Sequence, residues 1–401
     1  MSHIEDSQRW LNEVMSKIIE NLGPNADEAR YELSKSIVLI MTGIYYVRLQ
    51  FKNKTNGQNE ELSIVLKRPQ QDLCALHIEK QFHNEMLFYQ MYVRPDENHP
   101  RCFYVNERLP TDSVIALENV NERGYYSCSK QYDPPLQYTL AAMRELGRFH
   151  GKGYVMKEQR RKEFFDFVDQ LQAARYTKMM NFYRIAINIC ATRGVEYLRR
   201  QGYDAIFCDK MEALLSNGFD EVMIKMEPLE PLSTLCHGDF TLSNVLFKTE
   251  KDGKYRAMLI DFGLIMYSTP VVDLSTYLFM CCTNEERREK FSDIMRAYHD
   301  ALIEYLLDAG IQDVEKYSYN ALLDDFKRGA LFGLLLAPMI LPVLLGHGYD
   351  SATEIRKSYL NNTDIAEVSK KRKYLGGDKI CKILADSLLH LRDLGCLEQF
   401  L

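Results

Sequence analysis

Two short acidic motifs, separated by a hairpin-like stretch, constrain the fold of this chain more than any other feature. The first reads L-C-H-G-D-F-T-L-S-N-V-L-F and contains Asp239 and Asn244. The polar stretch K-T-E-K-D-G-K follows, and the run A-M-L-I then leads directly into D-F-G, which contains Asp261. Apolar runs on both sides of a polar turn with glycine are typical of two paired strands. The pattern therefore predicts a strand, a hairpin and a second strand between two acidic loops.

The residue types in these motifs suit the transfer of a phosphoryl group. Such a reaction needs a carboxylate that accepts the proton of the attacking hydroxyl. It also needs an amide oxygen and a second carboxylate that hold Mg²⁺ on the phosphates of a nucleotide. Asp239, Asn244 and Asp261 are these three residue types, at the spacing of a kinase catalytic loop and its metal loop. Because H-G-D alone occurs by chance in many chains, the prediction depends on the complete ordered set.

The block resembles the corresponding motif of the aminoglycoside-phosphotransferase and choline-kinase group within the protein-kinase-like fold, and most closely that of the ecdysteroid kinase-like family. The resemblance implies that Asp239 is the catalytic base and that Asn244 and Asp261 bind Mg²⁺. It also implies that Asp273 braces the catalytic loop, although a plain helix N-cap explains this aspartate equally well. We expect His237 to support its loop rather than to bind zinc, because the histidines show no metal-ligand spacing.

Two features depart from the family pattern. Thr241 and Ser243 stand where relatives commonly carry a tryptophan and a further asparagine. The loop expected to cover the phosphates offers only Gly43, although such loops usually carry several glycines so that backbone amides approach the phosphate oxygens. Thr42 or Tyr45 is then expected to supply part of this contact. Because this loop is poor in glycine, an alternative stays open. The chain is then a kinase-like protein that binds nucleotide or a hydrophobic small molecule with little or no catalysis.

The order of elements predicts an α+β, two-lobed protein-kinase-like fold. Apolar residues at helical spacing over Ser7–Leu22 predict a leading helix. Strand-like runs follow at Ile37–Ile40, Ile44–Phe51, Leu62–Leu66, Cys102–Val105 and Ser113–Val120. We expect residues 1–118 to form a small N-terminal lobe with the leading helix, a five-stranded antiparallel sheet and one more helix. Residues 119–401 are expected to form a large, mainly helical lobe with the catalytic loop, the metal loop and substrate-binding helices.

The N-terminal lobe is expected to bind ATP. Lys67 ends a V-L-K strand, where the resemblance places a lysine that contacts the α- and β-phosphates. Its expected ion-pair partner is Glu85 in Q-F-H-N-E-M-L-F-Y, and Glu79 on the same predicted helix is the alternative. The residues whose main-chain groups are expected to meet the adenine edge are Glu118, Asn119 and Val120. The predicted cofactors are therefore ATP and Mg²⁺.

A small molecule with a hydroxyl group is the expected acceptor. Gly238 stands where protein kinases carry an arginine that pairs with a phosphorylated activation segment, and Pro270 follows D-F-G too closely for a long activation loop. The chain has 25 tyrosines and 19 phenylalanines, which suit an apolar pocket for a steroid or a xenobiotic alcohol or phenol. A net charge of −6 without a basic arm disfavours nucleic acid as a partner.

One segment raises the question of a membrane. Gly329–Gly346 carries no charge over a length at the threshold for a transmembrane helix. Pro338 and Pro342 disfavour a spanning helix, and a helix that is apolar all round is also typical of the buried centre of a helical lobe. We therefore expect a buried helix and no membrane insertion. The polar N-terminus lacks the apolar core of a signal peptide, so we expect a cytoplasmic location with reduced cysteines.

Overall fold

A computed structural model of the chain describes residues 3–23, 26–39, 41–70, 77–108, 112–177, 182–223, 226–347 and 365–401. The chain divides into two compact units, Met1–Tyr125 and Tyr126–Leu401, which we call the sheet unit and the helical unit. The predicted α+β class, with a small antiparallel sheet near the N-terminus and a mainly helical remainder, is confirmed. The sequence predicts a boundary between the two lobes after residue 118. Asn119 bonds to the sheet unit, because its main-chain N–H donates to the carbonyl of Ser63 at 2.9 Å.

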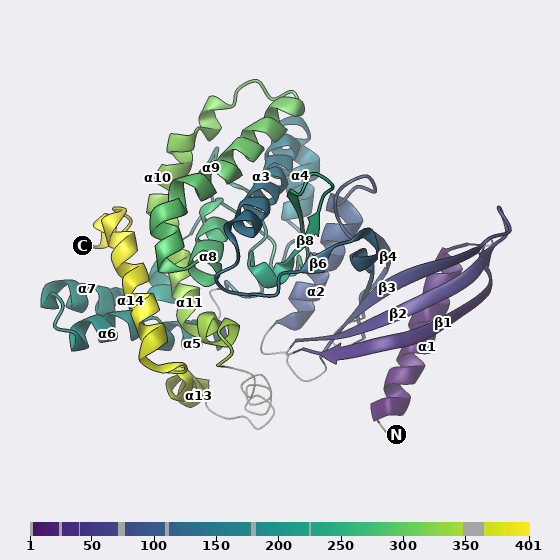
Figure 1. The fold of residues 1–401 in the computed structure, drawn as a ribbon, viewed down its shortest axis with the longest axis horizontal. Helices are drawn as coiled ribbons and strands as arrows, with labels where there is room; N and C mark the ends of the chain where they lie inside the picture. The colour runs from purple at the N-terminus through teal and green to yellow at the C-terminus, as the bar shows by residue number, and fades with distance from the viewer. Residues whose placement is uncertain are drawn as a thin grey trace. The chain divides into compact units, whose positions relative to one another are not determined.

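The sheet unit begins with a helix and continues mainly as strands (Figure 1). Its elements are α1 (His3–Asn21), β1 (Ala26–Val38), β2 (Thr42–Asn53), β3 (Asn59–Pro69), α2 (Ile78–Leu87), η2 (Phe88–Tyr92), β4 (Cys102–Asn106), β5 (Val114–Glu118) and η3 (Val120–Arg123). Among the described residues, five strands form one antiparallel sheet in the order β1-β2-β3-β5-β4. Ile40, the last residue of one predicted strand, lies outside the described residues.

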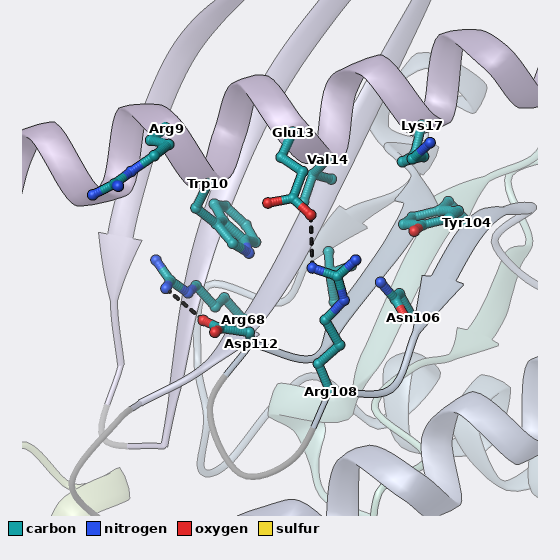
Figure 2. A pocket seen from close by; sticks show the side chains of 11 residues that line it. Arg9, Trp10, Glu13, Val14, Lys17, Arg68, Tyr104, Asn106, Arg108 and Asp112 are labelled. Carbon is teal, nitrogen blue, oxygen red and sulfur yellow. Dashed lines mark hydrogen bonds and ion pairs between the residues drawn. The ribbon is translucent and has the colours of Figure 1, made fainter.

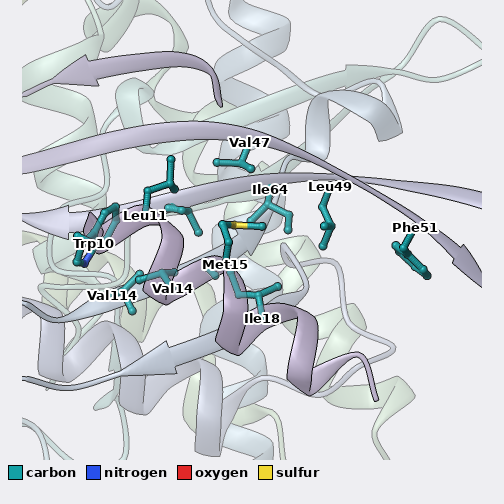
Figure 3. Close-up of a cluster of buried hydrophobic side chains, with 12 residues drawn as sticks. Trp10, Leu11, Val14, Met15, Ile18, Val47, Leu49, Phe51, Ile64 and Val114 are labelled. Carbon is teal, nitrogen blue, oxygen red and sulfur yellow. The ribbon is translucent and has the colours of Figure 1, made fainter. Parts of the chain in front are cut away.

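The hydrophobic core of the sheet unit lies between α1 and one face of this sheet (Figure 3). Apolar residues of α1 recur every three or four positions, so they form one stripe on the helix. Alternate residues of the strands face that stripe, because successive strand residues point to opposite faces. The buried members are Trp10, Leu11, Val14, Met15, Ile18, Val47, Leu49, Phe51, Ile64, Leu66, Val114 and Ala116. Lys67 follows Leu66 in β3 and therefore points to the other face of the sheet.

The helical unit contains the remaining elements. They are β6 (Tyr126–Ser127), α3 (Leu136–Gln159), α4 (Arg161–Val168), α5 (Phe182–Cys190), α6 (Arg193–Arg200), α7 (Ala205–Leu215), η4 (Phe219–Met223), β7 (Thr234–Cys236), η5 (Leu242–Asn244), β8 (Val245–Thr249), β9 (Tyr255–Leu259), β10 (Met266–Ser268), α8 (Val271–Cys281), α9 (Asn284–Asp308), η6 (Glu315–Tyr317), α10 (Tyr319–Gly329), α11 (Leu331–Leu344), α13 (Ile365–Arg372), α14 (Gly377–Asp393) and η7 (Glu398–Phe400). β6, β8 and β9 form one small antiparallel sheet, and β7 pairs with β10.

Glycines allow the closest helix contacts of the helical unit. α3 packs along α9 (Figure 1), and a Cβ atom at Gly147 would lie only 2.3 Å from the carbonyl oxygen of Tyr298. α11 packs on α8 in the same way, since a Cβ atom at Gly333 would lie 2.2 Å from the main chain of Ser275. A larger side chain at either position would force the helices apart. The packing therefore fixes α3 and α8, which carry His150 and Asp273, two residues bonded to each other beside the H-G-D loop.

The uncharged segment Gly329–Gly346 is mostly α11, and the side chains of Leu331–Pro338 in this helix are buried. Among the described residues, we find no individual helix with the length and apolar composition needed to cross a membrane. Glu315–Gly329 and Leu331–Leu344 reach that length and composition only as a pair, and they are bent by 56° relative to each other.

Candidate active site

The H-G-D sequence forms the loop that leaves β7. β7 pairs with β10 in an antiparallel register that sets Cys236 opposite Met266, so the loop lies beside the chain that follows D-F-G. Gly238 has φ +77°, a left-handed conformation that favours glycine. A Cβ atom at Gly238 would also lie 1.9 Å from the carbonyl oxygen of Leu264. A side chain at this position, such as the arginine of protein kinases, does not fit the observed loop.

Asp273 connects this loop to α8. Its carboxylate is fully buried and accepts the main-chain N–H of His237 at 2.6 Å and that of Gly238 at 2.8 Å. It also bonds the Nε2 atom of His150 at 3.0 Å. The N-cap residue of α8 is Pro270, which makes no side-chain cap bond. The hydrogen bonds of Asp273 therefore go to the loop and to α3, and they hold the turn that presents Asp239.

His150, Cys236 and Asp273 place their ligand atoms within 4.8 Å of one another, but their bonds suit a brace better than a metal site. The Nδ1 atom of His150 bonds the hydroxyl of Tyr298 at 2.9 Å. The thiol of Cys236 donates to the carbonyl of Thr269 at 3.3 Å, and burial raises its pKa, which keeps the sulfur protonated. Each of the three side chains therefore already has a hydrogen-bond partner within the chain.

Asp239 and Asn244 are in direct contact. The amide Nδ2 of Asn244 donates to the carbonyl oxygen of Asp239 at 2.8 Å and to its Oδ2 atom at 3.1 Å. Because these bonds use the nitrogen, the oxygen Oδ1 of the amide is the atom that suits a metal. The arrangement fixes one carboxylate oxygen of Asp239 and the direction of the asparagine together.

Asp261 is connected to the same loop through its neighbour Ile260. The main-chain N–H of Ile260 donates to the carbonyl of Asn244 at 3.0 Å, and its carbonyl bonds Nε2 of His237 at 3.0 Å. His237 thus connects the catalytic loop to the metal loop, as a support residue would. Asp261 itself has φ +68°, a left-handed conformation that is uncommon for a residue other than glycine. Carboxylate and amide oxygens are the ligands that Mg²⁺ prefers, so Asn244 and Asp261 fit that ion.

Sequence reasoning missed Arg175, which contacts the carboxylate of Asp239 directly. Its Nη1 atom lies 2.7 Å from Oδ1 of Asp239, and Arg175 is only 5% exposed. Burial is the largest single effect and lowers the pKa of this guanidinium, but Asp239, Tyr176 and Tyr183 together raise the pKa by more. The net direction is therefore upward, and the group stays charged. The ring of Tyr183 lies 5.1 Å from its Cζ atom. A buried cation therefore balances the proposed catalytic carboxylate.

The Lys67–Glu85 ion pair is present in the sheet unit. The Nζ atom of Lys67 contacts Oε2 of Glu85, and both side chains are buried. Glu79, the alternative partner, instead lies 3.5 Å from His77. Gly43 is paired with Arg68 across β2 and β3, one register position from Lys67, and a Cβ atom there would lie 3.2 Å from the ring of Tyr45.

The three residues predicted at the adenine edge lie at the end of β5. The N–H of Glu118 donates to the carbonyl of Arg101 at 2.7 Å, and the N–H of Asn119 donates to Ser63. Within the part of the chain that the structure describes, the N–H of Val120 donates to no other residue. Of the three main-chain amides, that of Val120 is therefore the donor best suited to an adenine base.

Comparison with known proteins matches the chain to one family model and to several solved structures. The family model described as the ecdysteroid kinase-like family matches residues 40–311. A comparison with curated protein sequences finds no match. Among solved structures, the chain is similar to the GDP and kanamycin complex of APH(2")-IIia, with 13% identity, a TM-score of 0.39 and coverage of 87% of this chain and 99% of that one. It is also similar to the GDP complex of aminoglycoside 2'-phosphotransferase-IIIa, with 10% identity, a TM-score of 0.41 and coverage of 92% and 97%. For a thermostable mutant of aminoglycoside phosphotransferase APH(4)-Ia with ADP and hygromycin B, the identity is 13%, the TM-score 0.33 and the coverage 92% and 97%.

Proposed function

This chain belongs to the ecdysteroid kinase-like family, and on this basis we propose that it transfers the γ-phosphoryl group of ATP to a hydroxyl of a small, apolar molecule. The observation that supports the proposal most is the position of Asp239. Its carboxylate is held between Arg175 and Asn244, yet its side chain is 25% exposed. A base that is fixed in direction and open to solvent on one side is what an incoming hydroxyl needs.

In the proposed reaction, the acceptor oxygen forms a bond to the γ-phosphorus while its proton passes to Asp239. The bond between the γ-phosphorus and the β,γ-bridging oxygen breaks, and ADP leaves. Two oxygens with several lone pairs let the carboxylate accept this proton while it keeps its bonds to Arg175 and Asn244. The contribution of the protein is then mainly positioning and charge balance.

The remaining predicted residues are proposed to bind MgATP. Oδ1 of Asn244 and the carboxylate of Asp261 hold Mg²⁺, which when bound neutralises charge on the phosphates. Lys67, fixed by Glu85, contacts the α- and β-phosphates. The group proposed to contact the phosphate oxygens on β2 is the main chain near Gly43. Those proposed to contact adenine are the main-chain groups of Glu118, Asn119 and Val120.

Aromatic side chains beside the base support an apolar acceptor. Tyr176 donates its hydroxyl to the carbonyl of Gly238 at 3.4 Å, and its ring lies 5.0 Å from that of Phe332. The ring of Tyr183 also lies near Arg175, so this part of the helical unit is rich in aromatic side chains. We propose ecdysteroids and xenobiotic alcohols or phenols as the acceptor class.

The test is to incubate the protein with γ-labelled ATP, Mg²⁺ and a panel of acceptors. An ecdysteroid, a phenol and an aliphatic alcohol are compared with an aminoglycoside. A labelled phosphate ester of one of the first three is the expected result. Labelled aminoglycoside alone would contradict the apolar acceptor. The second candidate is a protein that binds nucleotide without catalysis. The observation that favours it is that both carboxylate oxygens of Asp239 already accept hydrogen bonds. A nucleotide-dependent thermal shift without any labelled product would support this candidate.

Replacing Arg175 by glutamine is expected to lower kcat roughly 10- to 100-fold, because a hydrogen bond to a charged group is worth about 1.5–3 kcal/mol. The KM for ATP should stay the same, since Arg175 contacts the base. Arg175→Lys should recover part of kcat. Arg184→Gln is the matched control, because it breaks a comparable arginine–aspartate pair with Asp220 at 3.0 Å in the same unit. An unchanged or higher kcat in Arg175→Gln would show that Arg175 does not position Asp239 for the reaction.

A further inference from the structure

A second candidate site lies in the sheet unit. A pocket of about 350 Å³ opens between α1 and the ends of β3, β4 and β5 (Figure 2). One wall is the face of α1 that carries Trp10, Glu13 and Lys17, and the opposite wall carries Arg68 and Arg108. Figure 2 shows the side chains of Trp10 and Glu13 directed from α1 toward Arg68 and Arg108.

The pocket is distinct from the proposed ATP site. Lys67 and Arg68 are consecutive residues of β3, so their side chains point to opposite faces of the sheet. Arg68 is on the face that packs against α1, together with Ile64 and Leu66, whereas Lys67 pairs with Glu85 on the other face. Among the residues that line the pocket, none is predicted to contact ATP or Mg²⁺.

Positive charge dominates the lining. Its cationic residues are Arg9, Lys17, Arg68 and Arg108, and its carboxylates are those of Glu13 and Asp112. Arg68 Nη2 lies 2.9 Å from Asp112, and Arg108 Nη1 lies 2.6 Å from Glu13. Lys17 binds Glu20, which does not line the pocket. Because both lining carboxylates are already paired, the lining as a whole favours an added anion.

Trp10 contributes a buried donor to the same pocket. The residue is 7% exposed, and among the described residues its indole Nε1–H has no hydrogen-bond partner. Figure 2 shows the indole nitrogen on the ring edge that faces the side of Arg68 and Arg108. The Cζ atom of Arg68 lies 4.7 Å from the ring centroid of Trp10, so a cation covers part of the ring. Since buried N–H groups in proteins are nearly always bonded, this donor indicates an acceptor that the described residues do not supply.

We propose that this pocket binds a small organic anion. Its carboxylate or phosphate group accepts the indole N–H of Trp10 and pairs with Arg108, and its apolar part lies against Val14 and Tyr104. The volume is at the lower end of the range for small-molecule sites, which suits a ligand of one ring or a short chain.

The ion pair between Arg108 and Glu13 can open so that Arg108 binds an anionic ligand instead. Their side chains are 53% and 52% exposed, and ion pairs that are this exposed contribute little to stability. Arg108 can therefore leave Glu13 for an anionic ligand at low cost. Glu13 then competes with the ligand for the same guanidinium, so its charge should weaken binding.

Fluorescence tests the proposal directly, because Trp10 is the single tryptophan of the chain. The full-length protein is titrated with benzoate, phenyl phosphate and inorganic phosphate, and with benzylamine as the cationic counterpart, at saturating MgADP. A saturable change in emission with an anion, and none with benzylamine, is expected. Benzoate alone would assign carboxylates, and the two phosphates alone would assign phosphate groups. The proposal is overturned if no anion gives a saturable change up to about 10 mM, a concentration that detects even weak sites.

Two surface substitutions are expected to change the affinity for the anion in opposite directions. Arg108→Gln should weaken binding of the responding anion roughly tenfold, because a charge-assisted hydrogen bond is lost. Glu13→Gln should tighten binding several-fold by removing the competing carboxylate. Arg48→Gln, on the exposed part of β2 and outside the pocket, is the charge-matched control. Equal affinity in Arg108→Gln and the control would overturn the proposal. Because the experiment measures binding, its result does not depend on whether the protein transfers a phosphoryl group.

Discussion

Replacing Asp239 by asparagine is expected to lower the kcat of phosphoryl transfer by about 10²- to 10⁴-fold, the contribution of a general base. The amide has nearly the same size but does not accept the proton of the acceptor hydroxyl. Binding of MgADP should change little, because Asn244 and Asp261 are retained. The measurement is kcat with a responding acceptor, together with calorimetric binding of MgADP. Asp252→Asn, on the exposed turn between β8 and β9, is the control and should leave both quantities unchanged.

The same substitution leaves the buried guanidinium of Arg175 without its carboxylate, so a loss of stability must be separated from a loss of chemistry. Removing one partner of a buried pair destabilises by roughly 3–5 kcal/mol. The double variant Arg175→Gln, Asp239→Asn removes both charges and should recover part of the lost stability. It should stay inactive, because it still lacks the base. Near-normal turnover in either variant would refute Asp239 as the proton acceptor.

The parts of the site that the sequence predicts well are those encoded by neighbouring residues. Gly238, Asp239 and Asn244 lie within one loop, so their spacing alone restricts how they are arranged. Lys67 and Glu85 are close in the chain and lie on a strand and the following helix, and the structure has them in contact. For this pair, the family resemblance indicates which strand and which helix carry the two residues, so one sequence is sufficient for a specific hypothesis.

Arg175 could not be found in this way. It lies between α4 and α5, outside the described regular elements, and reaches Asp239 across 64 residues of chain. The sequence gives one indirect indication of such a residue. Gly238 stands where protein kinases carry an arginine, so a cation beside Asp239 has to come from another part of the chain. A charged residue in an irregular segment carries no periodicity, so its partner is set by tertiary packing alone.

The strand β1 is longer than the sequence pattern predicts, for a different physical reason. The sequence predicts a strand only at residues 37–40, whereas β1 spans Ala26–Val38. In the part of the chain that the structure describes, β1 is an edge strand and pairs only with β2, and it carries charged residues along most of its length. Edge strands often use such charges to prevent pairing with other chains, and this removes the apolar pattern that marks a strand.

Replacing Asp273 by alanine is expected to lower the free energy of unfolding by about 3–5 kcal/mol and to abolish most activity without touching a substrate. The main-chain amides of His237 and Gly238 and the ring of His150 would each lose a buried acceptor, and each such loss costs roughly 1–3 kcal/mol. The turn before Asp239 would then lose its connection to α8. Urea unfolding of the full chain and kcat measure the two effects.

This substitution also measures how strongly the buried carboxylate of Asp273 holds the loop, compared with an ordinary helix cap. A residue that only caps a helix costs about 0.5–2 kcal/mol when it is removed, and activity survives. Removing a residue that holds the loop lowers the free energy of unfolding by more than this. The kcat then also falls, because the loop loses its order. Asp293→Ala, an exposed aspartate near Lys290 on α9, is the matched control and should change stability by less than about 0.5 kcal/mol. If Asp273→Ala behaves like this control, the catalytic loop is held by its contacts with β10 and with Ile260, and the buried carboxylate does not position the base.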